Sequence, residues 1–178
     1  MPTILTHAAI PLAIGICLGR QIIPPRLLAA GILASILPDA DVVAFKLGIA
    51  YLDNFGHRGA SHSICFALLL GLFACLFAKQ LQSSRFGIFC FITVATASHG
   101  LLDMLTNGGE GVALFWPLSG QRWFFPWQVI EVSPIALKKI FSARFLAVLA
   151  SELVWVWLPL ACLCTMSLFW RKQATTER

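Results

Sequence analysis

The chain has 178 residues, of which 58% are hydrophobic and only 12% are charged. Its mean hydropathy of +0.82 and a charged fraction about half that of average soluble chains exclude a soluble domain and indicate an integral membrane protein. The net charge of +5 comes from dispersed basic residues in short loops and at the C-terminus, which is typical of topology signals and not of a nucleic-acid-binding surface.

Five apolar segments predict an all-α, multi-pass transmembrane bundle of four to five helices that forms a single integral-membrane domain. They cover about residues 5–19, 27–37, 64–78, 86–105 and 145–170. The last two reach the ~20 residues that a spanning helix needs, and the third does so if its polar lead-in is helical. The second stops at Pro38-Asp39. The first two are short, so each either crosses the membrane or forms a re-entrant element covered by the others.

A long aromatic-rich segment, about residues 107–144, separates the fourth apolar segment from the fifth. If all five segments cross, the connecting loops alternate between two faces. The short loops and the tail of one face carry Arg20, Arg26, Lys79, Arg85, Arg171, Lys172 and Arg178. The other face receives Lys46, Arg58, Arg122, Lys138, Lys139 and Arg144. Because the positive-inside bias weights short loops, the first face is predicted to be cytoplasmic and the second periplasmic.

All four histidines of the chain fall at the predicted periplasmic edge, together with several acids. The residues at this edge are His7, Asp39, Asp41, His57, His62, His99, Asp103 and Glu152. Polar groups at a membrane edge are costly unless they face protein, water or a metal. Their coincidence at one edge therefore predicts a functional site.

His99 and Asp103 lie four residues apart on a predicted helix, so both side chains point from one face. This spacing suits two ligands of one metal centre. The alternative is a hydrogen-bonded pair at a helix end.

Asp39 and Asp41 lie two residues apart where the second apolar segment stops. If the backbone there alternates, one carboxylate can face inward as a ligand while the other orients a neighbouring histidine. The alternative is a helix end followed by solvated acids.

His57 and His62 flank Gly59, whose backbone freedom allows a turn that brings both rings together. Arg58 is a planar fork suited to a phosphate or a carboxylate. Ser61 is a candidate N-cap for the third helix.

The combined set of His7, Asp39, Asp41, His57, His62, His99 and Asp103 contains nitrogen and oxygen donors without thiolates. Such a set suits a divalent metal, with zinc as the first choice and manganese or iron as alternatives. Seven candidates exceed one tetrahedral zinc site, so either two ions bind or some residues orient the ligands. A pair of ions would favour metal-assisted hydrolysis of a phosphoester.

Four motifs together resemble the bacterial inner-membrane family of the YdjM/YbcI type, and especially its YbcI branch. They are residues 4–9 (ILTHAA), 37–41 (LPDAD), 57–63 (HRGASHS) and 98–103 (SHGLLD). The likeness extends through residues 108–112, 126–130 and 151–159 and so covers most of the chain. One departure is Ser61, where relatives usually carry threonine. The resemblance implies a multi-pass inner-membrane location, a histidine/aspartate metal centre and a membrane-bound metal-dependent hydrolase.

The leading hypothesis is a hydrolase whose divalent metal is held by His7, Asp39, Asp41, His62, His99 and Asp103. His57 would be a further ligand or a base, and Arg58 would bind the anionic group of the substrate. The aromatic segment at the same edge suggests membrane lipids as partners and a lipid-linked phosphoester as the substrate. The alternative is a non-enzymatic metal-binding or ion-translocating protein that uses the same cluster. The sequence specifies neither the substrate nor the oligomeric state.

Overall fold

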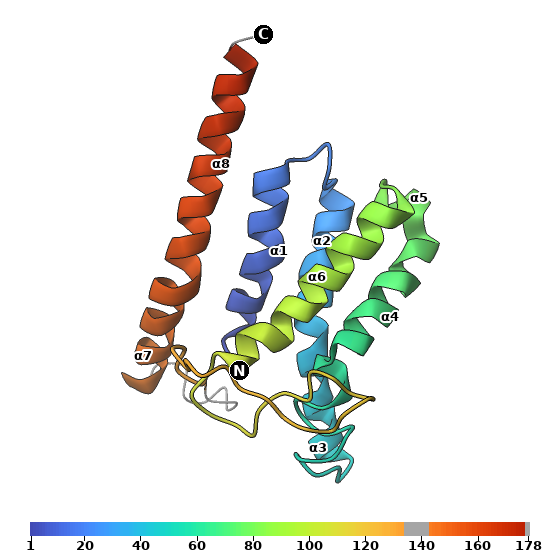
Figure 1. Ribbon diagram of the computed structural model, residues 1–178, viewed down its shortest axis with the longest axis vertical. Coiled ribbons are helices and arrows are strands. Elements are labelled where there is room, and N and C mark those ends of the chain that lie inside the picture. The colour runs from blue at the N-terminus through green and yellow to red at the C-terminus, as the bar shows by residue number, and fades with distance from the viewer. Residues whose placement is uncertain (134–142, 177–178) are drawn as a thin grey trace.

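The computed structural model describes residues 1–133 and 143–176 as a helical bundle whose long loops gather at one end (Figure 1). The described residues contain no strand, and their β-type pairing consists of isolated bridges between Thr106 and Ile130 and between Val112 and Trp123. The predicted all-α class is therefore confirmed. Lys138, Lys139 and Arg178, whose charges entered the predicted orientation, lie outside the described residues.

The first two helices, α1 (Ile4–Leu18) and α2 (Pro25–Ile36), lie side by side. Helix α2 continues through the 3₁₀ helix η1 (Leu37–Val42) into α3 (Val43–Lys46), which gives one apolar span of 22 residues, Pro25–Lys46. The sequence predicted a stop at Pro38, but Pro38 lies in the first turn of η1. A proline is tolerated there because its missing N–H would have no helical partner. The helix therefore changes from α to 3₁₀ geometry near Pro38 and does not end there.

Three further candidate spans follow along the chain. Helix α4 (Ile64–Ala74), the 3₁₀ turn η3 (Cys75–Phe77) and α5 (Ala78–Leu81) form the span Ile64–Leu81. Helix α6 (Arg85–Met104) forms the next span. Helix α7 (Ala143–Glu152), the π-helical turn η5 (Leu153–Trp157) and α8 (Leu158–Thr176) form one long apolar path.

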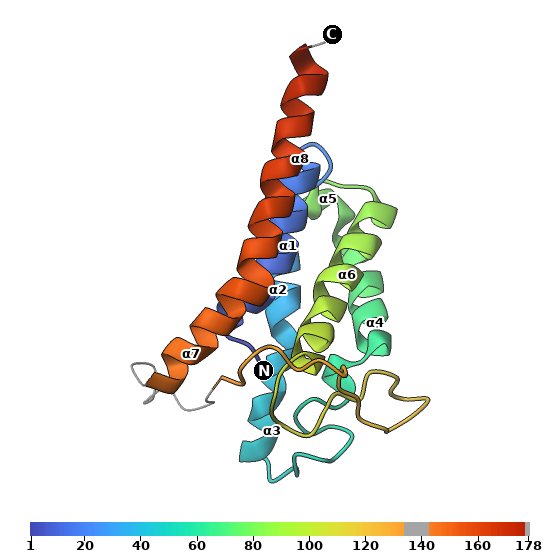
Figure 2. The same ribbon diagram turned by 60° about the vertical axis from the view of Figure 1, so that its left-hand side comes forward.

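Helix α6 is the central element, because it contacts α1, α2 and α4 (Figures 1 and 2). Its buried residues Ile88, Phe91 and Ile92 pack on Leu27 of α2. Gly31 permits this close contact, since a Cβ there would lie 2.3 Å from the Phe91 ring. Helix α4 buries little of its surface, which is expected where lipid replaces water as the neighbour.

The start of α4 differs from the prediction. Ser63, and not Ser61, is the N-cap, and its hydroxyl accepts a hydrogen bond from the Phe66 amide. Residues Ala60–His62 form the 3₁₀ turn η2, so the N-cap of α4 lies two residues later than predicted. Ser61 instead donates to Asp41 Oδ2 at 2.7 Å.

Glu152, an acid inside an apolar segment, fastens α7 to α1. Its carboxylate accepts hydrogen bonds from the Thr3 amide and from the hydroxyls of Thr3 and Thr6, each hydroxyl at 2.7 Å. Trp157 Nε1 donates to the same Thr6 hydroxyl at 2.9 Å. Residues five apart do not share a face of a regular α-helix, but the wider π turn between Glu152 and Trp157 lets both reach one threonine.

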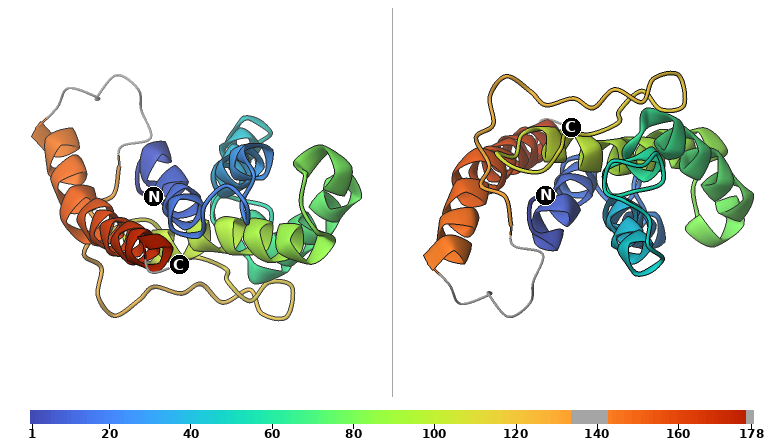
Figure 3. Two further views of the ribbon diagram at one scale, coloured as in Figure 1. Left: turned by 90° about the horizontal axis from the view of Figure 1, so that it is seen from above. Right: turned by 90° about the horizontal axis from the view of Figure 1, so that it is seen from below.

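The long loops lie across the end of the bundle at which α1 begins and α2 and α6 end. Figure 3, seen from below, shows the segment before α4 and the segment after α6 side by side at this end. Helix α8 carries the C-terminus to the opposite end (Figure 1). The fold thus brings the predicted polar residues to one end, where their side chains meet.

Candidate metal centre

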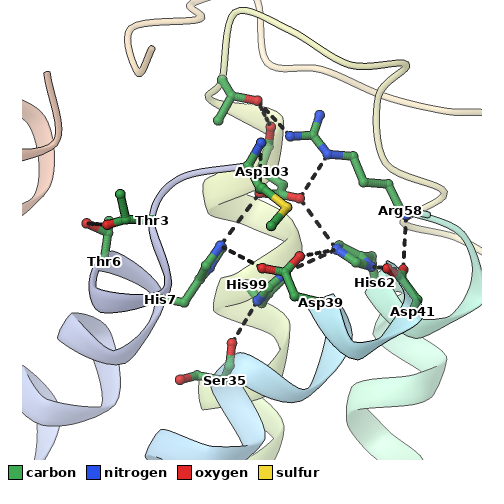
Figure 4. A network of polar contacts seen from close by, with 12 residues as sticks. Thr3, Thr6, His7, Ser35, Asp39, Asp41, Arg58, His62, His99 and Asp103 are labelled. Carbon is green, nitrogen blue, oxygen red and sulfur yellow. Dashed lines mark hydrogen bonds and ion pairs between the residues drawn. The ribbon is translucent and has the colours of Figure 1, made fainter. Parts of the chain in front are cut away.

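Five buried side chains from four elements converge at the loop end of the bundle (Figure 4). Helix α1 supplies His7, η1 supplies Asp39, η2 supplies His62, and α6 supplies His99 and Asp103. His99 and Asp103 share one face of α6, as their four-residue spacing predicted, and both are 0% exposed.

Four of these residues offer one ligand atom each within 4.8 Å of all the others: Asp39, His62, His99 and Asp103. His62 Nε2 lies 3.0 Å from His99 Nε2 and 3.4 Å from Asp103 Oδ2. His99 Nε2 lies 3.3 Å from Asp39 Oδ1. Ligand atoms about 2.0–2.1 Å from a tetrahedral zinc lie about 3.3 Å apart. The separations therefore suit one metal ion.

The contacts of His62 and His99 at Nδ1 turn the Nε2 atoms of both rings toward one another, to the position that an ion would occupy. His99 Nδ1 lies 2.7 Å from the Ser35 carbonyl oxygen, which only accepts, so Nδ1 carries the proton. His62 Nδ1 lies 3.0 Å from Ser61 Oγ and 3.2 Å from Asp41 Oδ2. A hydrogen-bond acceptor behind Nδ1 is the usual arrangement for a histidine that binds metal through Nε2.

Several buried atoms at the centre have no hydrogen-bond partner: both carboxylate oxygens of Asp39 and of Asp103, and both ring nitrogens of His7. Asp39 and Asp103 lie at ion-pair distance from the histidines but without hydrogen-bond geometry. A buried carboxylate without a partner lowers the free energy of unfolding by on the order of several kcal/mol. A divalent cation would satisfy these oxygens, so the residues present fit a metal.

The electrostatics of His62 also favour a cation. Burial opposes a charge on this ring, but its contacts with Asp103, Asp39 and Asp41 outweigh burial and raise the pKa of His62 to about 10. The carboxylates therefore stabilise positive charge beside them, either as a proton on His62 or as a metal ion that replaces it.

Asp41 has different neighbours from Asp39. Its Oδ1 accepts from His57 Nδ1 at 2.6 Å, and its Oδ2 accepts from the Arg58 amide at 3.1 Å. Side chains two residues apart in a 3₁₀ helix point about 120° away from each other, so Asp39 turns to the centre while Asp41 turns to the loop before α4. The sequence anticipated two roles for this pair, although the backbone is 3₁₀ and not extended.

Arg58, which was expected to bind an anionic substrate, is 1% exposed and fully engaged inside the protein. Its Nε lies 2.9 Å from Asp103 Oδ2, and its terminal nitrogens donate to the Gly108 carbonyl and to the Thr106 hydroxyl at 2.8 and 3.0 Å. Its backbone has a φ of 61°, a strained value for a residue with a Cβ. The structure therefore places Arg58 as a support for Asp103.

His57 and His62 lie together across the turn, with ring centroids 5.6 Å apart and the rings almost perpendicular. Arg122 closes the same loop, because it donates to the carbonyls of His57, Tyr51 and Asp53 at 3.0–3.1 Å. His57 is 2% exposed. The candidate residues of the loop are thus fixed by side chains from the segment after α6.

Some supporting residues were not identified from the sequence. Ser35 acts through its backbone carbonyl, which no side-chain pattern reveals. Thr106 lies two residues beyond α6, and a threonine just after a helix is common without any role in a site. Gly100 lets α6 approach η2, since a Cβ there would lie 2.7 Å from the His62 carbonyl oxygen. The position of this glycine next to His99 was the one sequence feature that could have indicated a close helix contact at the site.

Comparisons with known proteins identify relatives of this chain. The model of the family described as YdjM inner membrane protein matches residues 1–174. The inner membrane protein YbcI of Escherichia coli (strain K12) is 48% identical over 174 residues, which cover 97% of this chain and 100% of that protein. No solved structure matches the chain.

Proposed function

The chain belongs to the YdjM inner membrane protein family, and we propose that it is a metal-dependent hydrolase that acts on a lipid-linked phosphoester at the periplasmic face. Its multi-pass location in the inner membrane follows from the family and from the four apolar candidate spans. The observation that carries the proposal is the buried His/Asp group whose carboxylate oxygens lack hydrogen-bond partners.

Asp39, His62, His99 and Asp103 would hold the metal, which is zinc, manganese or iron given nitrogen and oxygen donors. A divalent ion held there supplies Lewis-acid polarisation of a phosphoryl oxygen and acidifies the attacking water. Ser35 and Asp41 fix the two imidazoles from behind, and Arg58 fixes the Asp103 carboxylate from the side. The protein therefore presents its ligands already oriented.

His57 is the proposed general base. Its Nδ1 is bonded to Asp41 at 2.6 Å, so Nε2 is the nitrogen that can take a proton from water. The Asp41 carboxylate stabilises the imidazolium that results, as an acid behind a catalytic histidine does elsewhere. Because Asp41 also contacts His62, one carboxylate aligns the base with the metal ligands.

A lipid substrate is supported by an apolar groove between α2, α4 and α6. The groove is lined by Ala30, Leu33, Ala34, Leu37, Leu70, Phe73, Ala74, Phe77, Leu81 and Ile92. One of its lining residues, Leu37, comes two residues before Asp39, so an acyl chain in this part of the groove would carry its head group toward the centre. Leu118 and Trp127, on the loop at the same end, are 94% and 72% exposed and suit insertion into the membrane interface.

The periplasmic orientation is supported by the basic residues. Arg20 lies in the short loop after α1, and Arg26, Lys79 and Arg85 lie in helix turns that flank short loops, all at the end away from the centre. Arg58 and Arg122, at the loop end, are engaged by Asp103 and by backbone carbonyls. A fluorescent protein that matures only in the cytoplasm, fused after α8, should therefore fluoresce, whereas a fused alkaline phosphatase should be inactive. The reverse pattern would place the centre in the cytoplasm.

The test of the function begins with metal content. Mass spectrometry of detergent-purified wild type should find near-stoichiometric zinc, manganese or iron, and the His62→Ala/His99→Ala variant should lose it. Phosphate or head-group release from phosphoester lipids in mixed micelles should follow the same pattern. His57→Gln should keep its metal and lose hydrolysis.

Folded wild-type protein without metal would overturn the proposal. So would metal-loaded protein that hydrolyses none of a broad panel of lipid phosphoesters, because a metal-binding role without catalysis would then remain. Hydrolysis unchanged in the His62→Ala/His99→Ala variant would also contradict it, since the activity would not depend on the centre.

A further inference from the structure

We propose that the centre binds a second metal ion on its His7 side, with Asp39 and Asp103 bridging the two ions. This inference rests on the proposed function, because it assigns a second position beside the one held by His62 and His99. The group of four residues that suits the first ion does not include His7, although His7 is 0% exposed and faces the same two carboxylates.

The imidazoles of His7 and His99 are stacked, with ring centroids 3.7 Å apart and ring planes only 13° from parallel. A metal bound by an imidazole nitrogen lies close to the plane of that ring. Two nearly parallel planes at this separation have no common point within a bond length of both rings. His7 and His99 therefore cannot bind the same ion, and any ion held by His7 is a separate one.

The oxygens of Asp39 and Asp103 divide between the two sides. His7 Nε2 lies 3.9 Å from Asp39 Oδ2 and 3.7 Å from Asp103 Oδ1. The other oxygens, Asp39 Oδ1 and Asp103 Oδ2, lie 3.3 Å from His99 Nε2 and 3.4 Å from His62 Nε2. Each carboxylate thus presents one oxygen to each side, which is how a carboxylate bridges two metals.

The unpartnered atoms give an independent reason to expect a cation on the His7 side. Both nitrogens of His7 and the oxygens that face it are buried and lack hydrogen bonds. A single ion at the His62–His99 position would leave His7 Nε2 and Asp39 Oδ2 unsatisfied, and Asp103 Oδ1 would have only the N-terminal amino group, 4.0 Å away. A second ion satisfies them.

The stacking distance also matches the chemistry. Paired metals in phosphoester hydrolases lie about 3.5–4 Å apart, and the ring centroids of His7 and His99 lie 3.7 Å apart. Two ions held by His7, His62, His99 and the two carboxylates would supply positive charge to both the attacking and the leaving oxygen of an in-line displacement. This inference narrows the substrate to one with a phosphoryl group that both ions can contact.

The test uses the full-length protein in detergent, stripped with chelator, reloaded with Mn²⁺ and freed of excess metal. Wild type should hold two Mn²⁺ ions per chain and give the electron paramagnetic resonance spectrum of an exchange-coupled pair. His7→Phe keeps the ring stacked on His99 and removes the nitrogens, so it should hold one ion with the spectrum of isolated Mn²⁺.

The wild-type spectrum needs no variant, so the inference stays testable if His7→Phe fails to fold. One isolated ion in the wild type, and the same in His7→Phe, would overturn the second position while the proposed function stands. No metal in the wild type would overturn the proposed function and the inference together.

Discussion

His57 donates from Nδ1 to Asp41 Oδ1 over 2.6 Å, and the other oxygen of the same carboxylate lies 3.2 Å from His62 Nδ1. One acid therefore fixes the ring orientation of the proposed base and of a proposed metal ligand. Substituting Asp41 separates this orienting role from metal binding itself.

Asp41→Asn should lower metal affinity by about 10–100-fold, because an amide oxygen accepts more weakly and its nitrogen faces the Arg58 amide, a second donor. Equilibrium dialysis with zinc would measure this loss. Asp53→Asn, at an exposed position before the same turn, is the matched control and should bind as wild type. Equal affinity in both variants would show that Asp41 does not support the centre.

Arg58→Gln should lower the free energy of unfolding by about 3–5 kcal/mol, since it leaves Asp103 buried without its ion-pair partner. Arg58→Lys should lose less, because the charge remains while the hydrogen bonds to Gly108 and Thr106 are lost. Thermal unfolding in detergent measures whether Arg58→Gln is less stable than Arg58→Lys and both are less stable than wild type. Arg26→Lys, on the opposite end of the bundle, should change little, and an Arg58→Gln protein as stable as this control would contradict the assigned support.

Glu152→Gln should loosen the start of α1. The carboxylate accepts hydrogen bonds from Thr3 and Thr6, and charged acceptors contribute about 1.5–3 kcal/mol per bond. Hydrogen exchange at residues 3–10 should become faster than in wild type. Glu110→Gln, an exposed acid on the loop, is the control; unchanged exchange in Glu152→Gln would mean that the bonds do not order α1.

Gly100→Ala should destabilise the protein by about 1–3 kcal/mol and reduce its metal content, because the new Cβ meets the His62 carbonyl at 2.7 Å. Gly87→Ala, on the same helix, meets only serine hydroxyls at 3.2 Å and should be close to neutral. Unfolding temperature and metal content of the pair give the comparison. Full metal content in Gly100→Ala would show that α6 need not approach η2 this closely.

Removal of the metal should lower the unfolding temperature of the wild type, because the buried Asp39 carboxylate is then left without a hydrogen-bond partner. Zinc in hundredfold excess over its dissociation constant should restore about 2.7 kcal/mol. The His62→Ala/His99→Ala variant should respond to neither chelator nor zinc. A chelator that leaves the wild-type unfolding temperature unchanged would argue against a structural ion.

The membrane class, the helical bundle and the common end of the polar residues follow from the sequence, since spans require long apolar runs and short loops carry the topology signal. The continuation of α2 beyond Pro38 does not follow, because a proline stops an α-helix but fits the first turn of η1. The π turn before α8 could not be predicted either, because a π turn inserts a residue into a helix without changing the residue types that the helix contains.

Within the candidate centre, the shared face of His99 and Asp103 could be predicted from their spacing alone. The partners of Arg58 and Glu152 could not. Arg58 reaches a backbone carbonyl and a hydroxyl, and Glu152 reaches two threonines at the other end of the chain. Such contacts depend on the packing of distant elements, which local patterns do not encode.

The ligand set is completed by α6, which lies well after η1 and η2 in the chain. During synthesis the N-terminal elements form first, so Asp39 and His62 reach the membrane before His99 and Asp103 can join them. An ion held by this group would therefore be acquired late in assembly, because no nascent chain that ends before α6 holds the complete group. An ion bound there would come from the compartment that the loop end faces, so the metal supply of that compartment, and not that of the ribosome's surroundings, would select the bound metal.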